Sequence, residues 1–130
     1  MNCCYKLIGM ACALCLSLGC GQSDDGRYDL SGQVTIDGKP VPMGEVILEP
    51  DSTAGNQGPS SMAQISDGYY ELPGEQGIVG GNYNVTILAF DGVPFGESLS
   101  GKALLREPYV EKVDFPKEDS THDFAITRGN

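Results

Sequence analysis

Two kinds of hydrophobic pattern divide the chain. Residues 7–18 form one apolar run of about twelve residues that follows Lys6, and a polar segment begins directly after Cys20. A run of this length fits the core of an export signal, roughly 7–15 residues, and is shorter than the 18 or more that a membrane-spanning helix needs. The pattern therefore predicts a signal peptide over residues 1–19.

After residue 27 the hydrophobic residues alternate with polar ones in short segments, which is the pattern of half-buried β-strands. Asp-Gly pairs and prolines separate the segments. Residues 91–108 lack this alternation, and Gly101 weakens the short helix that residues 97–106 would form, so we expect an irregular crossover there. The expected strands cover residues 28–36, 44–49, 61–66, 69–72, 82–90, 109–115 and 121–127.

Six or seven short strands joined by turns predict an all-β fold, a Greek-key β-sandwich of about seven strands in one domain over residues 28–130. Prolines remove amide donors, so residues 39–42 are expected to form an extended connector, while residues 51–60 have the composition of a flexible loop. The residues expected to share the inward faces of the strands are Leu30, Gly32, Val34, Ile36, Val46, Leu48, Ala63, Ile65, Tyr70, Leu72, Tyr83, Val85, Ile87, Ala89, Val113, Phe115, Phe124 and Ile126.

The end of the apolar run resembles the lipobox of bacterial lipoproteins. Gly19 and Cys20 match that motif, whereas Ser17 and Leu18 stand in reversed order. The resemblance implies that a diacylglycerol is attached to the thiol of Cys20, that cleavage follows Gly19, and that residues 20–27 form a lipidated tether. An ordinary secretory signal that happens to contain cysteines is the alternative.

The distribution of cysteines and charges narrows the classes of function. None of the five cysteines follows Cys20, so a mature chain would have no internal disulfide and no cysteine-based zinc site. The formal net charge is -10, and so acidic a surface argues against nucleic acid and against anionic lipid surfaces as partners. The content of 18 glycines and 8 prolines agrees with short strands joined by turns.

Three segments resemble, in this order, those of carboxypeptidase regulatory-like domains, also called transthyretin-like or prealbumin-like domains. They are the first strand and turn over residues 31–41, the Asp-Gly-aromatic hairpin over residues 67–72, and the Gly-x-Tyr-x-Val strand start over residues 81–85. The resemblance covers about residues 30–90 and extends more loosely to Ile126. Together with the signal, it is similar to small cell-envelope lipoproteins of planctomycete-type bacteria. It implies a β-sandwich in which Tyr83 is buried and bonds a backbone carbonyl through its hydroxyl.

No arrangement of residues indicates catalysis, a cofactor or a bound metal. His122 is the single histidine, and Asp123 beside it would point to the opposite face of a strand, so an exposed or edge histidine is expected. Some transthyretin-like proteins are hydrolases whose sites use several histidines, an arginine and a C-terminal Tyr-Arg-Gly-Ser. Only Arg128 and Gly129 coincide with that ending, so the chain is not expected to be an enzyme.

These observations lead to the hypothesis of a lipid-anchored, non-enzymatic module of the cell envelope with a structural or protein-binding accessory role. Its expected partners are a membrane, through Cys20, and an envelope protein or polysaccharide on the periplasmic or outer side. The alternative is a carbohydrate- or calcium-binding module that uses residues 51–60 and 91–101. Outward-facing tyrosines can stack on sugars or form a protein interface. The tyrosines expected to lie outward are Tyr28, Tyr69 and Tyr109.

Overall fold

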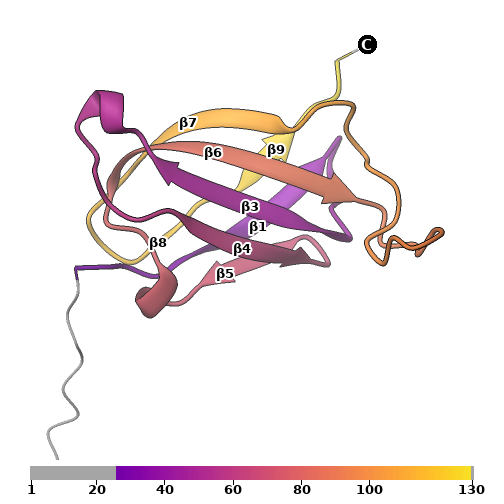
Figure 1. Cartoon of the computed structure of the whole chain (residues 1–130), viewed down its shortest axis with the longest axis horizontal. Coiled ribbons are helices and arrows are strands. Elements are labelled where there is room, and N and C mark those ends of the chain that lie inside the picture. Colours follow the sequence, from indigo (N-terminus) through magenta and orange to yellow (C-terminus); the bar gives the residue numbers. More distant parts are fainter. Residues whose placement is uncertain (1–25, 130) are drawn as a thin grey trace, which may run out of the picture.

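The structure, a computed structural model that describes residues 26–129, consists of strands joined by turns and short 3-10 helices (Figure 1). It confirms the all-β prediction. The signal peptide, Cys20 and most of the tether lie outside the described residues. The elements are β1 (Leu30–Ile36), β2 (Lys39–Pro40), β3 (Met43–Pro50), η1 (Ser52–Ala54), β4 (Ser61–Ser66), β5 (Tyr69–Leu72), η2 (Gly74–Gln76), β6 (Gly81–Phe90), β7 (Tyr109–Phe115), β8 (Ser120–Thr121) and β9 (Phe124–Ile126).

The strands form one sheet that curls around its own core. Neighbours pair along the path β2-β1-β5-β4-β3-β6-β7, and every pair on this path is antiparallel. Strands β8 and β9 pair with β1 in the parallel sense. The curl brings β7 and β9 to the same side of the molecule, as Figure 1 shows. The strand pairing is continuous, and the more specific Greek-key sandwich arrangement stays a prediction.

The alternating side chains fill the inside of the curl. All the residues expected to face inward are buried except Val113, which is half-buried on β7. Val41 and Ile78 are also fully buried, although they belong to connecting segments without alternation. Ile78 is held there by two backbone hydrogen bonds with Tyr28. Burying such an aliphatic side chain contributes about 1.5–3 kcal/mol, so these connections belong to the core as much as the strands do.

Two Asp-Gly turns fix the register of two hairpins. Their φ values are 51° and 79° at Asp37-Gly38, and 50° and 79° at Asp67-Gly68. Positive φ at both central residues defines the type I′ turn, whose twist suits antiparallel strands. The first turn leads into β2, so part of the expected connector over residues 39–42 is a two-residue edge strand paired with β1. Proline is tolerated on an edge because its missing N–H faces no neighbour.

Tyr83 fixes the corner at which the chain enters β6. Its ring is buried and lies edge-on to Phe115, with 5.5 Å between the ring centroids. Its hydroxyl oxygen accepts a hydrogen bond from the N–H of Val79 at 3.0 Å. The expectation of a bond to a backbone carbonyl was therefore wrong, because the hydroxyl meets the N–H of Val79 and accepts instead of donating.

The last strand differs from the prediction, since residues 121–127 are divided into β8 and β9. At the division, the Asp123 carboxylate accepts a hydrogen bond from the N–H of Gln33 at 2.8 Å. The Tyr70 hydroxyl donates to the carbonyl of His122 at 2.5 Å. Burial raises the pKa of Tyr70, so its hydroxyl keeps the proton that it donates. Side chains from β5 and from the link between β8 and β9 thus replace part of the backbone ladder, which the local sequence does not reveal.

Gly32→Ala is expected to loosen the contact between β1 and the β8–β9 segment. An added Cβ would overlap the carbonyl oxygen of His122, so one of the two strands would have to move. Overpacking of this kind lowers the free energy of unfolding by about 1–3 kcal/mol, which urea denaturation measures. Gly129→Ala adds a Cβ that meets nothing within 4 Å and is the control. Equal stability of the two variants would contradict the close approach.

Candidate functional site

The two loops considered for ligand binding lie at opposite ends of the sheet. Residues 51–60 follow β3 and contact the start of β6 at Asn82, whereas residues 91–101 follow the end of β6 (Figure 1). They therefore cannot form one shared site. Binding of carbohydrate or calcium by either loop stays a prediction, and each loop would have to bind its ligand alone.

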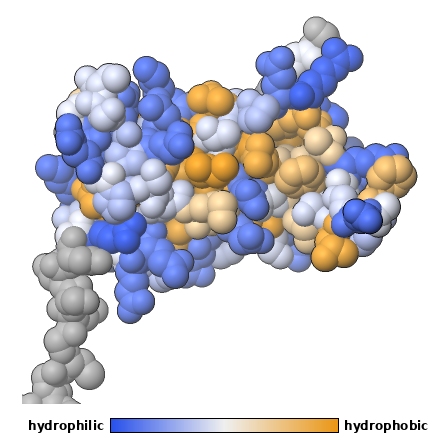
Figure 2. Space-filling view, in the orientation of Figure 1, coloured by the Kyte–Doolittle hydropathy of each residue, from blue (hydrophilic) through white to orange (hydrophobic). Residues whose placement is uncertain are grey.

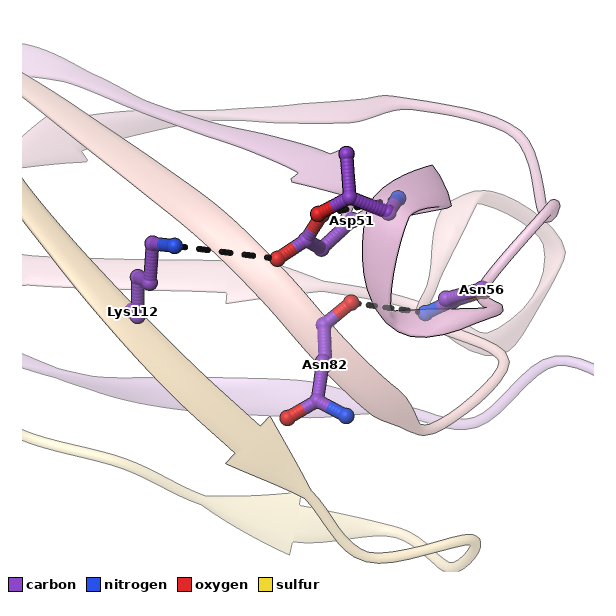
Figure 3. A network of polar contacts seen from close by, with 5 residues as sticks. Asp51, Asn56, Asn82 and Lys112 are labelled. Carbon is purple, nitrogen blue, oxygen red and sulfur yellow. Dashed lines mark hydrogen bonds and ion pairs between the residues drawn. The ribbon is translucent and has the colours of Figure 1, made fainter.

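Asp51 organises the first loop from inside. Its carboxylate accepts hydrogen bonds from the N–H and the hydroxyl of Thr53, at 3.1 and 2.5 Å, and lies 4.0 Å from the Lys112 ammonium (Figure 3). The hydrogen bond from Thr53 is the main cause that lowers the pKa of Asp51. The residue is 7% exposed. This carboxylate therefore holds the η1 turn in place and is poorly available to an ion from solvent.

Asn56 attaches the same loop to the start of β6. Its side-chain amide donates to the carbonyls of Gly80 and Asn82 at 3.1 and 2.9 Å (Figure 3 draws the bond to Asn82). Its side-chain oxygen accepts from the N–H of Gly58 at 3.2 Å. The composition predicts a flexible loop, but these bonds give residues 51–58 a defined path along the sheet.

Residues 91–102, here called the distal hairpin, are also ordered. Backbone hydrogen bonds join Asp91 to Lys102 and, at the tip, Phe95 to Ser98 in both directions. The Asp91 carboxylate accepts from the N–H groups of Val93 and Lys102, at 2.9 and 3.0 Å. The expected irregular crossover thus contains a closed hairpin without a regular strand or helix.

The tip of the distal hairpin is apolar and exposed to solvent. Val93, Phe95 and Leu99 are 63%, 64% and 80% exposed. The Lys102 ammonium lies 4.8 Å from the centre of the Phe95 ring, a cation–π contact that keeps this ring on the surface. Single exposed apolar residues are ordinary, but three on one ordered hairpin indicate an interaction surface. Figure 2 shows apolar surface at this end of the molecule.

Three hollows open at the same end, with volumes of about 510, 210 and 180 Å³, and each is lined in part by residues 104–108. The largest lies between the start of β7, at Tyr109 and Val110, and the residues that follow β9, at Thr127 and Arg128. Of these residues only Tyr109 was considered for binding, as an outward tyrosine that could stack on a sugar or form an interface. The curl of the sheet alone brings them together, and the adjacent aliphatic pair Leu104-Leu105 was the only sequence signal.

His122 closes the other end of the gap between β7 and β9. Its ring centroid lies 5.5 Å from that of Phe115 and 4.6 Å from that of Phe124, with both contacts edge-on. The histidine is half-buried between the two edge strands. It is therefore an edge histidine with a packing role, and it lies away from the large hollow.

The tyrosines expected to face outward differ from one another in exposure. Tyr69 is 48% exposed on β5. Tyr28 and Tyr109 are partly buried and pack against the core. The expectation was wrong for these two because Tyr28 pairs with Ile78, and because Tyr109 lies on the same face of β7 as the buried Phe115.

Comparisons with protein-family models and with curated proteins found no match for this chain. Within residues 26–129, no three His, Cys, Asp or Glu side chains come together as metal ligands. The same residues contain no helix of sufficient length and hydrophobicity to cross a bilayer. The distal hairpin and the adjacent hollows are therefore the candidate functional site on geometric grounds.

Asp51→Asn is expected to change how stability depends on pH. The pKa of Asp51 is lowered in the folded protein from 3.8, so its ionised form stabilises the fold above that pH, and this contribution is lost as pH falls through the folded pKa. The variant should melt below the wild type at neutral pH, with a difference that shrinks under acid. Thermal melts over a pH series measure this, with the exposed Glu118→Gln as control. A difference that stays constant with pH would contradict the role of the charge.

Asp91→Ala is expected to loosen the distal hairpin without unfolding the sheet. Two N–H donors would lose their carboxylate acceptor, so amide hydrogen exchange over residues 92–102 should become roughly tenfold faster. Exchange in β3 and β6 should not change. Glu97→Ala, at the exposed tip, is the matched control. Unchanged exchange in Asp91→Ala would show that this carboxylate does not order the hairpin.

Proposed function

We propose that this chain is a lipid-anchored accessory lipoprotein of a bacterial cell envelope, with a non-catalytic carboxypeptidase regulatory-like domain that binds a protein partner. Cys20 carries the lipid, residues 20–27 form the tether, and the domain faces the periplasm or the exterior. An envelope polysaccharide is the second class of partner.

The observation that carries this proposal is that the start of the domain and the candidate functional site lie at opposite ends of the molecule. The described chain begins beside the start of β1, where Tyr28 pairs with Ile78. The distal hairpin lies at the opposite end of the molecule (Figure 1). The three hollows are lined by residues at that same end, near the ends of β1 and β6. A domain tethered to a bilayer at its first residues would present this opposite end away from the membrane, where a partner can reach it.

The contacts that the carboxylates and the histidine make within the domain favour a binding role over catalysis. The carboxylates of Asp51 and Asp91 accept hydrogen bonds from their own loops, and the His122 ring packs between two phenylalanines. General acid–base catalysis requires such groups to converge on a shared space. Here each of them is part of the scaffold.

The three segments that carry the family resemblance support the proposed family through their structural roles. The two Asp-Gly pairs form tight hairpin turns, and Tyr83 is buried at the corner that opens β6. These are contributions to folding, and they recur in a family because the fold needs them. They carry no information about a substrate.

Cys20→Ser is expected to release the protein from the membrane. Without this thiol no diacylglycerol can be attached, so the protein should move to the soluble fraction and lose incorporation of a labelled fatty acid. Fractionation of expressing cells, with mass spectrometry of the mature N-terminus, measures both effects. Cys15→Ser, within the apolar run, should keep the label and the membrane location. A Cys20→Ser protein that stays membrane-bound and labelled would overturn the proposed anchor.

A further inference from the structure

Strand β7 has an unpaired edge. It pairs with β6 over residues 109–115 and, within the described part of the chain, makes no backbone hydrogen bond to any other segment. Strand β9, which approaches from the other side, is paired with β1 instead. The outward N–H and C=O groups of β7 therefore form a row that can accept another strand.

The usual protection of such an edge is weak here. A lysine in the middle of an edge strand commonly discourages pairing. Lys112 holds that position in β7, but its side chain extends back across β6 toward Asp51, the residue that follows β3 on the far side of β6 (Figure 3). Pro108 and Pro116 bound the strand without interrupting it. The strand is seven residues long, and the large hollow opens beside its first residues, Tyr109 and Val110.

The hollow of about 510 Å³ beside this edge is lined by aliphatic and charged side chains that an added segment could contact. Leu104 and Leu105 are half-buried in its lining. The lining carries two guanidinium groups, those of Arg106 and Arg128, and one carboxylate, that of Glu107. The Asp37 carboxylate, which binds Arg128, adds a second negative charge, so the formal charges cancel at this position of a chain whose net charge is -10.

The two arginines of the lining differ in whether another residue binds their guanidinium group. Arg128 is held by Asp37, whose carboxylate accepts hydrogen bonds from its Nε at 2.7 Å and from its backbone N–H at 3.1 Å. This interaction lowers the pKa of Asp37, so the pair stays ionised. Arg106 is exposed and has no hydrogen-bond or ion-pair partner among residues 26–129. It can therefore bind a carboxylate from outside.

The geometry points to an extended peptide segment of a partner protein as the occupant of this gap. The segment adds as a strand to the outer edge of β7, places aliphatic side chains over Leu104 and Leu105, and brings a carboxylate to Arg106. Main-chain hydrogen bonds supply affinity in this mode of recognition, and the side chains supply selectivity. The inference deepens the proposed binding role by naming the site and the chemistry of the partner.

The test uses the purified full-length protein and a synthetic peptide of alternating valine and threonine with one central glutamate. Binding should protect amides in the first half of β7, beside the hollow, from hydrogen exchange. A peptide N-methylated at alternate residues lacks one row of donors and should lose binding. Arg106→Ala should weaken binding of the glutamate peptide about tenfold, and should leave a glutamine version of the peptide unaffected. Lys117→Ala, beside Gly80 at the other end, is the control.

Each contrary result has a definite meaning. Binding that survives N-methylation in both registers would exclude strand addition, and binding that Arg106→Ala does not weaken would exclude the charge pairing. Protection of β7 that rises with protein concentration in the absence of peptide would identify a second copy of this chain as the occupant. No binding at all would overturn the inference. Lipid labelling at Cys20 is independent of these results, so the proposed anchor and this site can fail separately.

Discussion

The curled sheet depends on β1 having hydrogen-bonded neighbours along both of its edges. Strands β2 and β5 pair on one edge, and β8 and β9 pair on the other. Gly32 makes the second set possible, because a side chain there would meet the carbonyl of His122. The C-terminal strands are thereby held against β1, and the sheet turns back over its own core. The free edge of β7 follows from the same pairing, since the strand that could have covered it is bonded elsewhere.

The polar residues of the loops are largely used in building the domain. Asp51 and Asp91 each accept backbone N–H groups of the loop that they begin, and Asn56 bonds the carbonyls of the neighbouring strand. Backbone groups at the ends of strands need partners, and short polar side chains provide them. A count of acidic residues in the sequence therefore overstates how many oxygens remain for a ligand.

The alternation of hydrophobic and polar residues predicted the strands well, because it depends only on residues that are close together in the sequence. Three of the strands, at residues 61–66, 69–72 and 109–115, have the predicted bounds. The division between β8 and β9 could not be predicted, because it depends on Tyr70 and Gln33, which lie far away along the chain. The hydrogen-bonded structure of the distal hairpin could not be predicted either, because Lys102 closes it through backbone groups that every residue type has. Of the candidate site, residues 91–101 were considered as a binding loop, whereas the hollows beside them were missed for the same reason. Residues 104–110 and 126–129 meet only because the sheet curls.

An open strand edge normally invites pairing between identical copies, and the charge of this chain bears on that risk. Every copy carries a formal charge of -10, so two copies repel each other as they approach. With self-pairing opposed by the whole molecule, the edge of β7 has less need of a guarding lysine, and Lys112 is able to turn toward Asp51. Repulsion acts over a Debye length of about 8 Å at physiological salt, whereas the guanidinium of Arg106 acts at contact. Long-range repulsion between copies and short-range attraction for one carboxylate are therefore compatible on the same surface.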